Sequence, residues 1–369
     1  MTGLRLARLA WGAALALGLT TGGLSAAEEI KIGTVLPMTG DAASYGTWMR
    51  NGMNIAVDQI NAKWGPERKL TVIYEDSKSN PRDGVAAMNK LIAADRVGAV
   101  MTTLTGITKA LIPIAEEKKV ILTTSATLPG ITEGKSHVFR NATNLGSEIR
   151  ALNEFAKTRY KKAAILWVNL EWADWGAKAF EKQFKADGGE VVGSLSFAPD
   201  ATDVRAQLTR IRVAKPDVIL VLAYKTTGQV LKQARELGIE APFIGTLDFE
   251  LPEVVQIAKE AAEGSVYTKA VFDTDNPVAG TMTDYTAEYQ KRYGQKPEVY
   301  GATMYDMLLI LAEAMAKSNG DTEATRKAIL SVKDFPGASG TTTFLPNGDV
   351  DKAVELKTIK GGQYVDYKN

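Results

Sequence analysis

The chain has 369 residues, no cysteine, one histidine and a formal net charge of +1, with 45% hydrophobic and 24% charged residues. This composition suits a soluble globular protein large enough for two domains, and it excludes disulfides, cysteine-ligated metals and a histidine-rich zinc site. The balanced charge also argues against a nucleic-acid partner, because such binding relies on clusters of Lys and Arg that neutralise phosphates.

The first 27 residues have the pattern of a secretory signal peptide. Arg5 and Arg8 precede an apolar stretch at 9–19, and small residues ending at Ala27 come before Glu28. The stretch is about half of the roughly 20 residues that span a bilayer, and we expect no later segment to be apolar enough to cross one. Cleavage near Ala27 removes Arg5 and Arg8, which changes the formal charge from +1 to −1. The sequence therefore predicts an exported, periplasmic chain.

The first half of the remaining chain alternates short apolar runs with amphipathic helical patterns. After the first run, Met49, Met53 and Ile60 recur at helical spacing and form one apolar stripe. Such alternation is typical of a parallel sheet that is covered by helices on both faces. The predicted strands are 32–36, 70–74, 97–101 and 120–122.

A second, similar series begins near residue 146, which predicts an α/β protein with two lobes. Its helices include 203–213. After a last run at 266–270 the pattern changes to two long helices, 278–293 and 300–317. A hairpin-like turn at 345–349 then precedes a strand at 354–359. The other predicted strands of this series are 163–168, 191–197, 218–222 and 243–244.

Common catalytic and cofactor motifs are absent from the sequence. It contains no GxxxxGK[ST], GxGxxG, GxSxG or HExxH, and no serine has a lysine three positions later. His137 is the only histidine that a catalytic triad could use, and we expect it to be a surface residue entering a strand. We therefore expect no catalytic residue, no metal and no cofactor, and we keep an exported enzyme only as a third hypothesis.

Hydroxyl-bearing residues follow two predicted strands of the first half, at 102–106 and 123–127. Ligands of open α/β sheets bind beyond the carboxyl ends of the strands, where helix N-termini present free N–H groups. Hydroxyls and such N–H groups together suit a carboxylate without a buried Lys or Arg. Each hydroxyl taken alone is equally well explained as a helix cap, so the prediction rests on their convergence.

The corresponding loops of the second half carry aromatic rings and acids. Trp172 lies in a loop beside acids, which favours the wall of a cleft, whereas Trp175 suits a core stripe equally well. Tyr224 follows the predicted strand 218–222, and Asp248 follows the predicted strand 243–244. The two halves thus predict one cleft with hydroxyls on one side and with rings and carboxylates on the other.

Several stretches carry a family resemblance that runs over nearly all of the mature chain: 30–33 (IKIG), 36–40 (LPMTG), 74–77 (YEDS), 114–120 (IAEEKKV) and 228–235 (GQVLKQAR). Through them the chain resembles the periplasmic branched-chain amino acid binding proteins, the type I solute-binding family of ABC importers. The resemblance implies two lobes, each a mainly parallel sheet flanked by helices, joined by three crossings with the ligand cleft between them. It implies a signal peptide at 1–27, a first lobe of 28–145 plus 272–350, and a second lobe of 146–271 plus 351–369.

The resemblance also implies which residues bind the ligand. In the first lobe the carboxylate-binding positions look like Thr105 and Thr127, with Leu104 and Ser125 beside them, and an aromatic at Tyr45 lines the cleft. In the second lobe the cleft tyrosine looks like Tyr224, beside Trp172. The acid that binds the ligand ammonium falls at Leu247 by direct count, and Asp248 is one residue later. A slip of one residue makes Asp248 the partner, and no slip favours a ligand without an ammonium.

These observations lead to one main hypothesis and two alternatives. The chain is expected to bind a branched-chain or related amino acid by lobe closure and to present it, as a monomer, to the membrane permease of an ABC importer. Within the same class, the rings near the second-lobe loops favour an aromatic acid, another small carboxylate or an amide. In a different class, the same fold serves as a ligand sensor that couples to a signalling partner.

Overall fold

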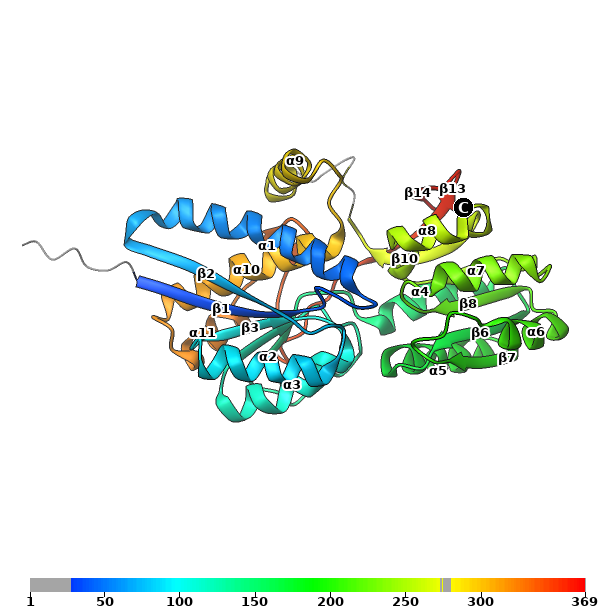
Figure 1. Ribbon diagram of the computed structural model, residues 1–369, viewed down its shortest axis with the longest axis horizontal. Helices are drawn as coiled ribbons and strands as arrows, with labels where there is room; N and C mark the ends of the chain where they lie inside the picture. Colours follow the sequence, from blue (N-terminus) through cyan, green and yellow to red (C-terminus); the bar gives the residue numbers. More distant parts are fainter. Residues whose placement is uncertain (1–27, 273, 275–279, 369) are drawn as a thin grey trace, which may run out of the picture.

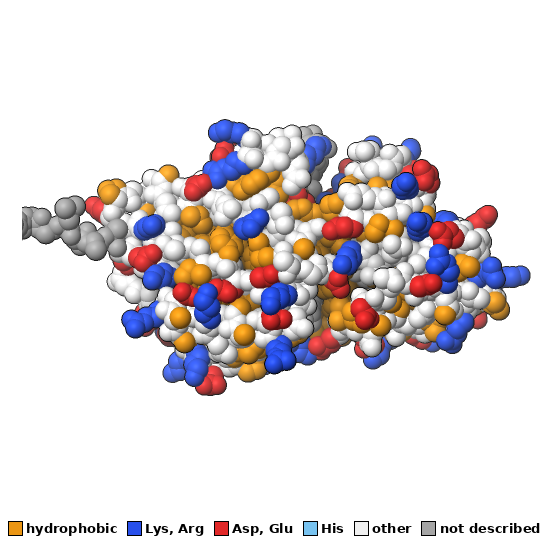
Figure 2. All heavy atoms as spheres, viewed as in Figure 1, with side chains coloured by type: hydrophobic (Ala, Val, Ile, Leu, Met, Phe, Trp, Pro, Cys, Tyr) orange, Lys and Arg blue, Asp and Glu red, His pale blue; other side chains and the backbone are white. Residues whose placement is uncertain are grey.

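The computed structural model describes residues 28–272, 274 and 280–368, and it consists of two lobes side by side along the long axis (Figure 1). The predicted signal peptide, residues 1–27, lies outside the described residues. Positive and negative side chains are interspersed over the face shown in Figure 2, as expected for a chain with almost no net charge.

The first lobe is built on a five-stranded parallel sheet in the order β2-β1-β3-β4-β5. Its central strands are buried throughout, because helices cover both faces. One hydrophobic cluster forms under α1 and α10, and another forms under α2 and α3. The elements are β1 (Glu28–Leu36), α1 (Ala43–Trp64), β2 (Arg68–Asp76), α2 (Pro81–Ala93), β3 (Ala99–Thr102), α3 (Thr105–Lys118), β4 (Ile121–Thr124) and β5 (Val138–Arg140).

The second lobe is built on a seven-stranded sheet in the order β14-β13-β10-β9-β8-β6-β7. Strands β6 to β10 are parallel, and β13 and β14 add antiparallel strands at one edge. The elements are α4 (Leu145–Lys157), β6 (Lys162–Val168), α5 (Glu171–Ala186), β7 (Glu190–Phe197), α6 (Arg205–Ala214), β8 (Val218–Leu222), α7 (Thr227–Glu236), β9 (Phe243–Gly245), α8 (Pro252–Ala258), β10 (Val266–Ala270), β13 (Val354–Lys360) and β14 (Gln363–Asp366).

After β10 the chain returns to the first lobe through α9 (Thr281–Tyr293), α10 (Val299–Lys317) and α11 (Thr322–Leu330). Helix α10 packs along α1, and Gly52 and Gly301 meet at this contact, since a Cβ atom on Gly52 would lie 2.1 Å from the Gly301 carbonyl oxygen. The first residues of the predicted helix 278–293 lie outside the described part of the chain. A short hairpin of β11 (Phe335–Gly337) and β12 (Gly340–Thr342) follows α11.

The expectation that no segment after the signal peptide is apolar enough to cross a membrane was wrong for α10. Among the helices that the structure describes, α10 is long and apolar enough to span a bilayer, with a mean hydropathy of 1.2. However, 83% of that stretch is buried inside the protein. The apolar length of α10 is explained by its burial against α1, α11 and β1, because a helix surrounded by protein is hydrophobic on all sides.

The predicted lobe boundaries near 145, 271 and 350 fall where the chain passes from one sheet to the other, between β5 and β6, after β10 and before β13. The exact boundaries stay a prediction. Two of the crossings are tied together by a buried ion pair, in which Arg140 Nε donates to Asp349 Oδ1 at 2.7 Å. Arg140 also donates to the carbonyl of Leu128, which satisfies its buried guanidinium.

Candidate ligand-binding site

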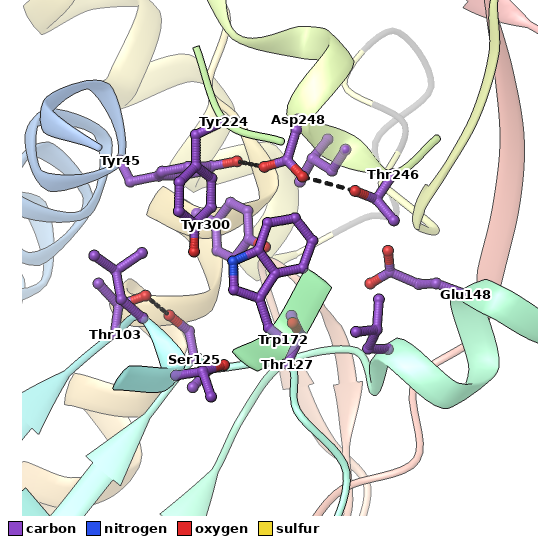
Figure 3. A pocket seen from close by; sticks show the side chains of 15 residues that line it. Tyr45, Thr103, Ser125, Thr127, Glu148, Trp172, Tyr224, Thr246, Asp248 and Tyr300 are labelled. Atoms are coloured by element: carbon purple, nitrogen blue, oxygen red, sulfur yellow. Dashed lines mark hydrogen bonds between the residues drawn. The ribbon is translucent and has the colours of Figure 1, made fainter. Parts of the chain in front are cut away.

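The carboxyl ends of the parallel strands of both sheets face one cavity between the lobes (Figure 3). Its empty volume, which includes some open solvent, is about 470 Å³. All eight sequence-predicted site residues line it: Tyr45, Leu104, Thr105, Ser125, Thr127, Trp172, Tyr224 and Asp248. Seven more residues line it. Thr103, Ala126, Thr246 and Leu247 lie in loops that the sequence singled out, whereas the sequence did not point to Leu145, Glu148 and Tyr300.

The first lobe contributes hydroxyl groups to the cavity. Ser125 Oγ, after β4, donates a hydrogen bond of 2.9 Å to Thr103 Oγ1, after β3, and both side chains are buried. Thr105 begins α3, where backbone N–H groups carry the partial positive charge of a helix N-terminus. Leu104 precedes it with a φ of +61°, a backbone conformation that is strained for leucine. This end of the cavity has the donors that a carboxylate requires.

An aromatic wall connects the two lobes across the cavity. Tyr45 of α1 contacts Tyr300 of α10 edge-on, with ring centroids 4.9 Å apart, and it faces Tyr224 of the second lobe at 6.1 Å. The Trp172 indole lies 5.1 Å from the Tyr224 ring. The buried indole Nε1 has no hydrogen-bond partner among the described residues, so it is a donor available to a ligand.

Asp248 supplies a buried carboxylate from the second lobe. It accepts a hydrogen bond of 2.6 Å from the Tyr45 hydroxyl, which crosses between the lobes, and one of 2.7 Å from Thr246 Oγ1. Burial raises the pKa of Asp248 to about 6, and these two hydrogen bonds oppose that shift. Leu247, the position reached by direct count, also lines the cavity but carries no charge.

Glu148 is a second buried acid in the cavity. It lies in the first turns of α4 and accepts a hydrogen bond of 2.8 Å from Thr143 Oγ1. Burial raises the pKa of Glu148 to about 7, against the hydrogen bond from Thr143, and the charge of Asp248 adds to the increase. The strand expected after His137 is β5, but the loop that follows it was not among the predicted binding loops, so Glu148 was missed. The rule for strand ends, applied to β5, points to this loop.

Further contacts join the lobes around the cavity. Ser44 Oγ donates to Glu253 Oε1 at 2.6 Å, next to the bond between Tyr45 and Asp248. Two ion pairs cross the cleft as well, Asp41 with Lys225 and Lys109 with Glu171, each at 2.5 Å. A more apolar hollow with an empty volume of about 750 Å³ adjoins the cavity between these pairs and shares the Trp172 and Tyr224 wall with it. The structure therefore has the lobes closed on each other.

The groups that could bind a metal or carry a positive charge near the cavity are acids, histidine, lysine and arginine. In residues 28–272, 274 and 280–368 no group of three or more acids and histidines is arranged to hold a metal ion. His137 is partly buried just before β5, where its Nδ1 lies 3.2 Å from Glu116 Oε2, and it does not line the cavity. Among the described residues that line the cavity, none is Lys, Arg or His.

The comparisons with known proteins agree with this architecture. A family model described as periplasmic binding protein matches residues 29–363. A Leu/Ile/Val-binding protein of Rhizobium johnstonii is 28% identical and is aligned over 87% of this chain and 89% of its own. A branched-chain amino acid transporter substrate-binding protein of Streptococcus pneumoniae, solved with isoleucine, has a TM-score of 0.85 at 27% identity and covers 93% of this chain and 100% of its own.

A third relative matches in fold. A solute-binding protein of an ABC transporter from R. palustris, solved with benzoate, has a TM-score of 0.82 at 21% identity and covers 92% of this chain and 95% of its own. The predicted two-lobed type I architecture and the solute-binding role are confirmed by these matches together with the two sheets. With the family model spanning both lobes, the chain belongs to the periplasmic binding protein family.

Proposed function

We propose that the protein binds an aliphatic α-amino acid, of the branched-chain or a related kind, between its two lobes. The main support is the polarity of the cavity, which has hydroxyls and a helix N-terminus on the first-lobe side and buried carboxyls on the second-lobe side. An α-amino acid has a carboxylate and an ammonium to match these two sides. The aromatic wall between them suits an aliphatic side chain.

The eight predicted residues have distinct roles in this proposal. Thr105 and Thr127, with Ser125 and the main chain at Leu104, hold the carboxylate. Tyr45, Trp172 and Tyr224 enclose the side chain. Asp248 stands on the acidic side and contacts Tyr45 across the cleft, so it is sensitive to closure as well as to ligand charge.

An aromatic acid is the second candidate, and the ring-rich wall is the observation that favours it. The relative solved with benzoate has this fold. The charges in the cavity weigh against it, because a benzoate ion has no cation to offer to two buried acids. We therefore place the amino acid first.

The remaining parts of the proposal concern the cellular role. The protein acts in the periplasm after cleavage near Ala27, works as a monomer, and delivers its solute unaltered to the membrane permease of an ABC importer. Solute capture by a hinge motion requires no bond to be made or broken, so the protein is not an enzyme. The names of two relatives support this role: one is a Leu/Ile/Val-binding protein, and the other is the substrate-binding protein of an amino acid transporter.

Thermal unfolding with a panel of solutes tests the function. The chain from Glu28 onwards is unfolded and refolded to release any co-purified solute, then heated with leucine, isoleucine, valine, benzoate or 4-hydroxybenzoate. We expect the aliphatic amino acids to raise the melting temperature, since ligand at about 100 times its Kd adds about 2.7 kcal/mol of stability. Mass spectrometry is expected to recover the solute unchanged. A shift with the benzoates alone would favour the second candidate.

A further inference from the structure

The two acids of the cavity are not held in the same way. Each oxygen of Asp248 accepts a short hydrogen bond, from Tyr45 at 2.6 Å and from Thr246 at 2.7 Å. These donors position the Asp248 carboxylate in the contact between the lobes. They also stabilise the negative charge of Asp248 in the absence of a ligand.

Glu148 has more capacity left for a ligand. Its Oε1 accepts the hydrogen bond from Thr143 at 2.8 Å, whereas its Oε2 has only a long contact of 3.5 Å with Thr268 Oγ1. The residue is 4% exposed and lines the cavity. In Figure 3 it lies on the opposite side of Trp172 from the pair Thr103 and Ser125. A solute that spans the cavity from the hydroxyl side therefore reaches toward Glu148.

A buried carboxylate with an unfilled acceptor needs a positive partner. Among the described residues that line the cavity, no Lys, Arg or His supplies one. The charge of Asp248 nearby makes the demand stronger, since two carboxylates that interact in a buried site favour a cation between or beside them. When Glu148 is ionised, the positive partner therefore has to come from the ligand.

We propose that Glu148, rather than Asp248, is the principal receptor of the ligand's ammonium group, and that Asp248 mainly closes the lobes by accepting the Tyr45 hydrogen bond. The inference rests on the proposed function, and it resolves the choice between Leu247 and Asp248 by assigning the role to a different element, α4. The ammonium then donates to Glu148 Oε2, and the ligand carboxylate lies on the side of Thr103 and Ser125.

Two matched pairs test the assignment. The ligands are leucine and 4-methylpentanoate, which has the same carbon chain and carboxylate without the amino group. The variants are Glu148→Gln and Asp248→Asn, each of which removes one charge, keeps the size of the side chain and replaces one acceptor oxygen with an amide NH2 group. Calorimetry gives the ratio of the two affinities for the wild type and for each variant, and far-UV circular dichroism checks that the variants fold.

We expect the wild type to prefer leucine by roughly 30-fold or more, the usual effect of a buried charge pair. Glu148→Gln is expected to bring the two affinities within about threefold of each other, mostly by weakening leucine. Asp248→Asn is expected to weaken both ligands by similar factors and so to keep the preference.

Three other results would contradict the assignment of Glu148 as the ammonium receptor. If Glu148→Gln keeps the preference and Asp248→Asn loses it, Asp248 is the receptor and the inference is wrong. If the wild type binds both ligands equally, neither acid recognises an ammonium, and the inference is again wrong. Failure of the wild type to bind either ligand refutes the proposed function and this inference with it.

Discussion

Glu148 shows how one residue connects the chemistry of the cavity to the stability of the fold. Its carboxyl is buried beside Asp248, and burial raises the pKa of Glu148 from its ordinary value of 4.5 to about 7. An acid whose pKa is raised by folding contributes stability below its unfolded pKa, and that contribution is lost as the pH rises through the folded pKa. Above neutral pH the ligand-free protein therefore has a conflict between two buried carboxylates in its binding site, Glu148 and Asp248, which lowers its stability.

Glu148→Gln is expected to relieve this conflict. Relative to the wild type, the unfolding free energy of the ligand-free variant rises between pH 5 and pH 8, by on the order of 2–3 kcal/mol. Denaturant titrations at the two pH values measure the difference. Glu240→Gln, at an exposed position, is the matched control and is expected to follow the wild type. A parallel pH dependence for Glu148→Gln and wild type would mean that Glu148 is not held as described.

At the scale of elements, local pattern indicated most of the fold because the central strands are buried on both faces and are therefore continuous apolar runs, as at β3 and β8. It indicated β5 only through the expectation that His137 enters a strand, because β5 has three residues and ends in Arg140. That arginine is buried because Asp349, 209 residues away, neutralises it. A partner so distant in sequence leaves no local signal.

The same distinction applies to the site. The eight predicted residues lie after predicted strands or at positions that the family resemblance singled out, so the carboxyl-end rule and that resemblance found them. Tyr300 was missed because it begins α10, which comes to the cavity only when the chain returns to the first lobe. Glu148 was missed because the loop between β5 and α4 was not among the predicted binding loops. Tyr300 and Glu148 thus reach the cavity through the tertiary structure and not through a local sequence pattern.

The contact between α1 and α10 gives a prediction at this scale. Gly52→Ala would place its Cβ 2.1 Å from the Gly301 carbonyl oxygen, which forces the two helices apart. We expect the free energy of unfolding to fall by about 2–3 kcal/mol, the usual range for overpacking. Gly106→Ala in α3 is the control, since its Cβ would lie 3.6 Å from Pro81, an ordinary contact. Equal unfolding free energies for the two variants would contradict the close helix contact.

At the scale of the whole molecule, closure depends on bonds that join lobes the chain connects only through its crossings. The exposed ion pairs at the cleft, such as Asp41 with Lys225, contribute little because water screens them. The bond between Tyr45 and Asp248 differs, since both residues are buried and the acceptor is a carboxylate. This hydrogen bond therefore has the largest expected share in holding the closed state.

Tyr45→Phe is expected to shift the protein toward open forms and to weaken solute binding by roughly tenfold or more, because a hydrogen bond to a charged group contributes about 1.5–3 kcal/mol. Calorimetry measures the affinity, and small-angle X-ray scattering measures the radius of gyration, which should increase in the variant. Tyr74→Phe is the matched control: it removes a hydroxyl that donates to Asn54 Oδ1 at 2.9 Å inside the first lobe. If both variants bound solute like the wild type, the hydrogen bond between Tyr45 and Asp248 would have no part in closure, which would then depend on the ligand and on the other contacts between the lobes, such as Ser44 with Glu253.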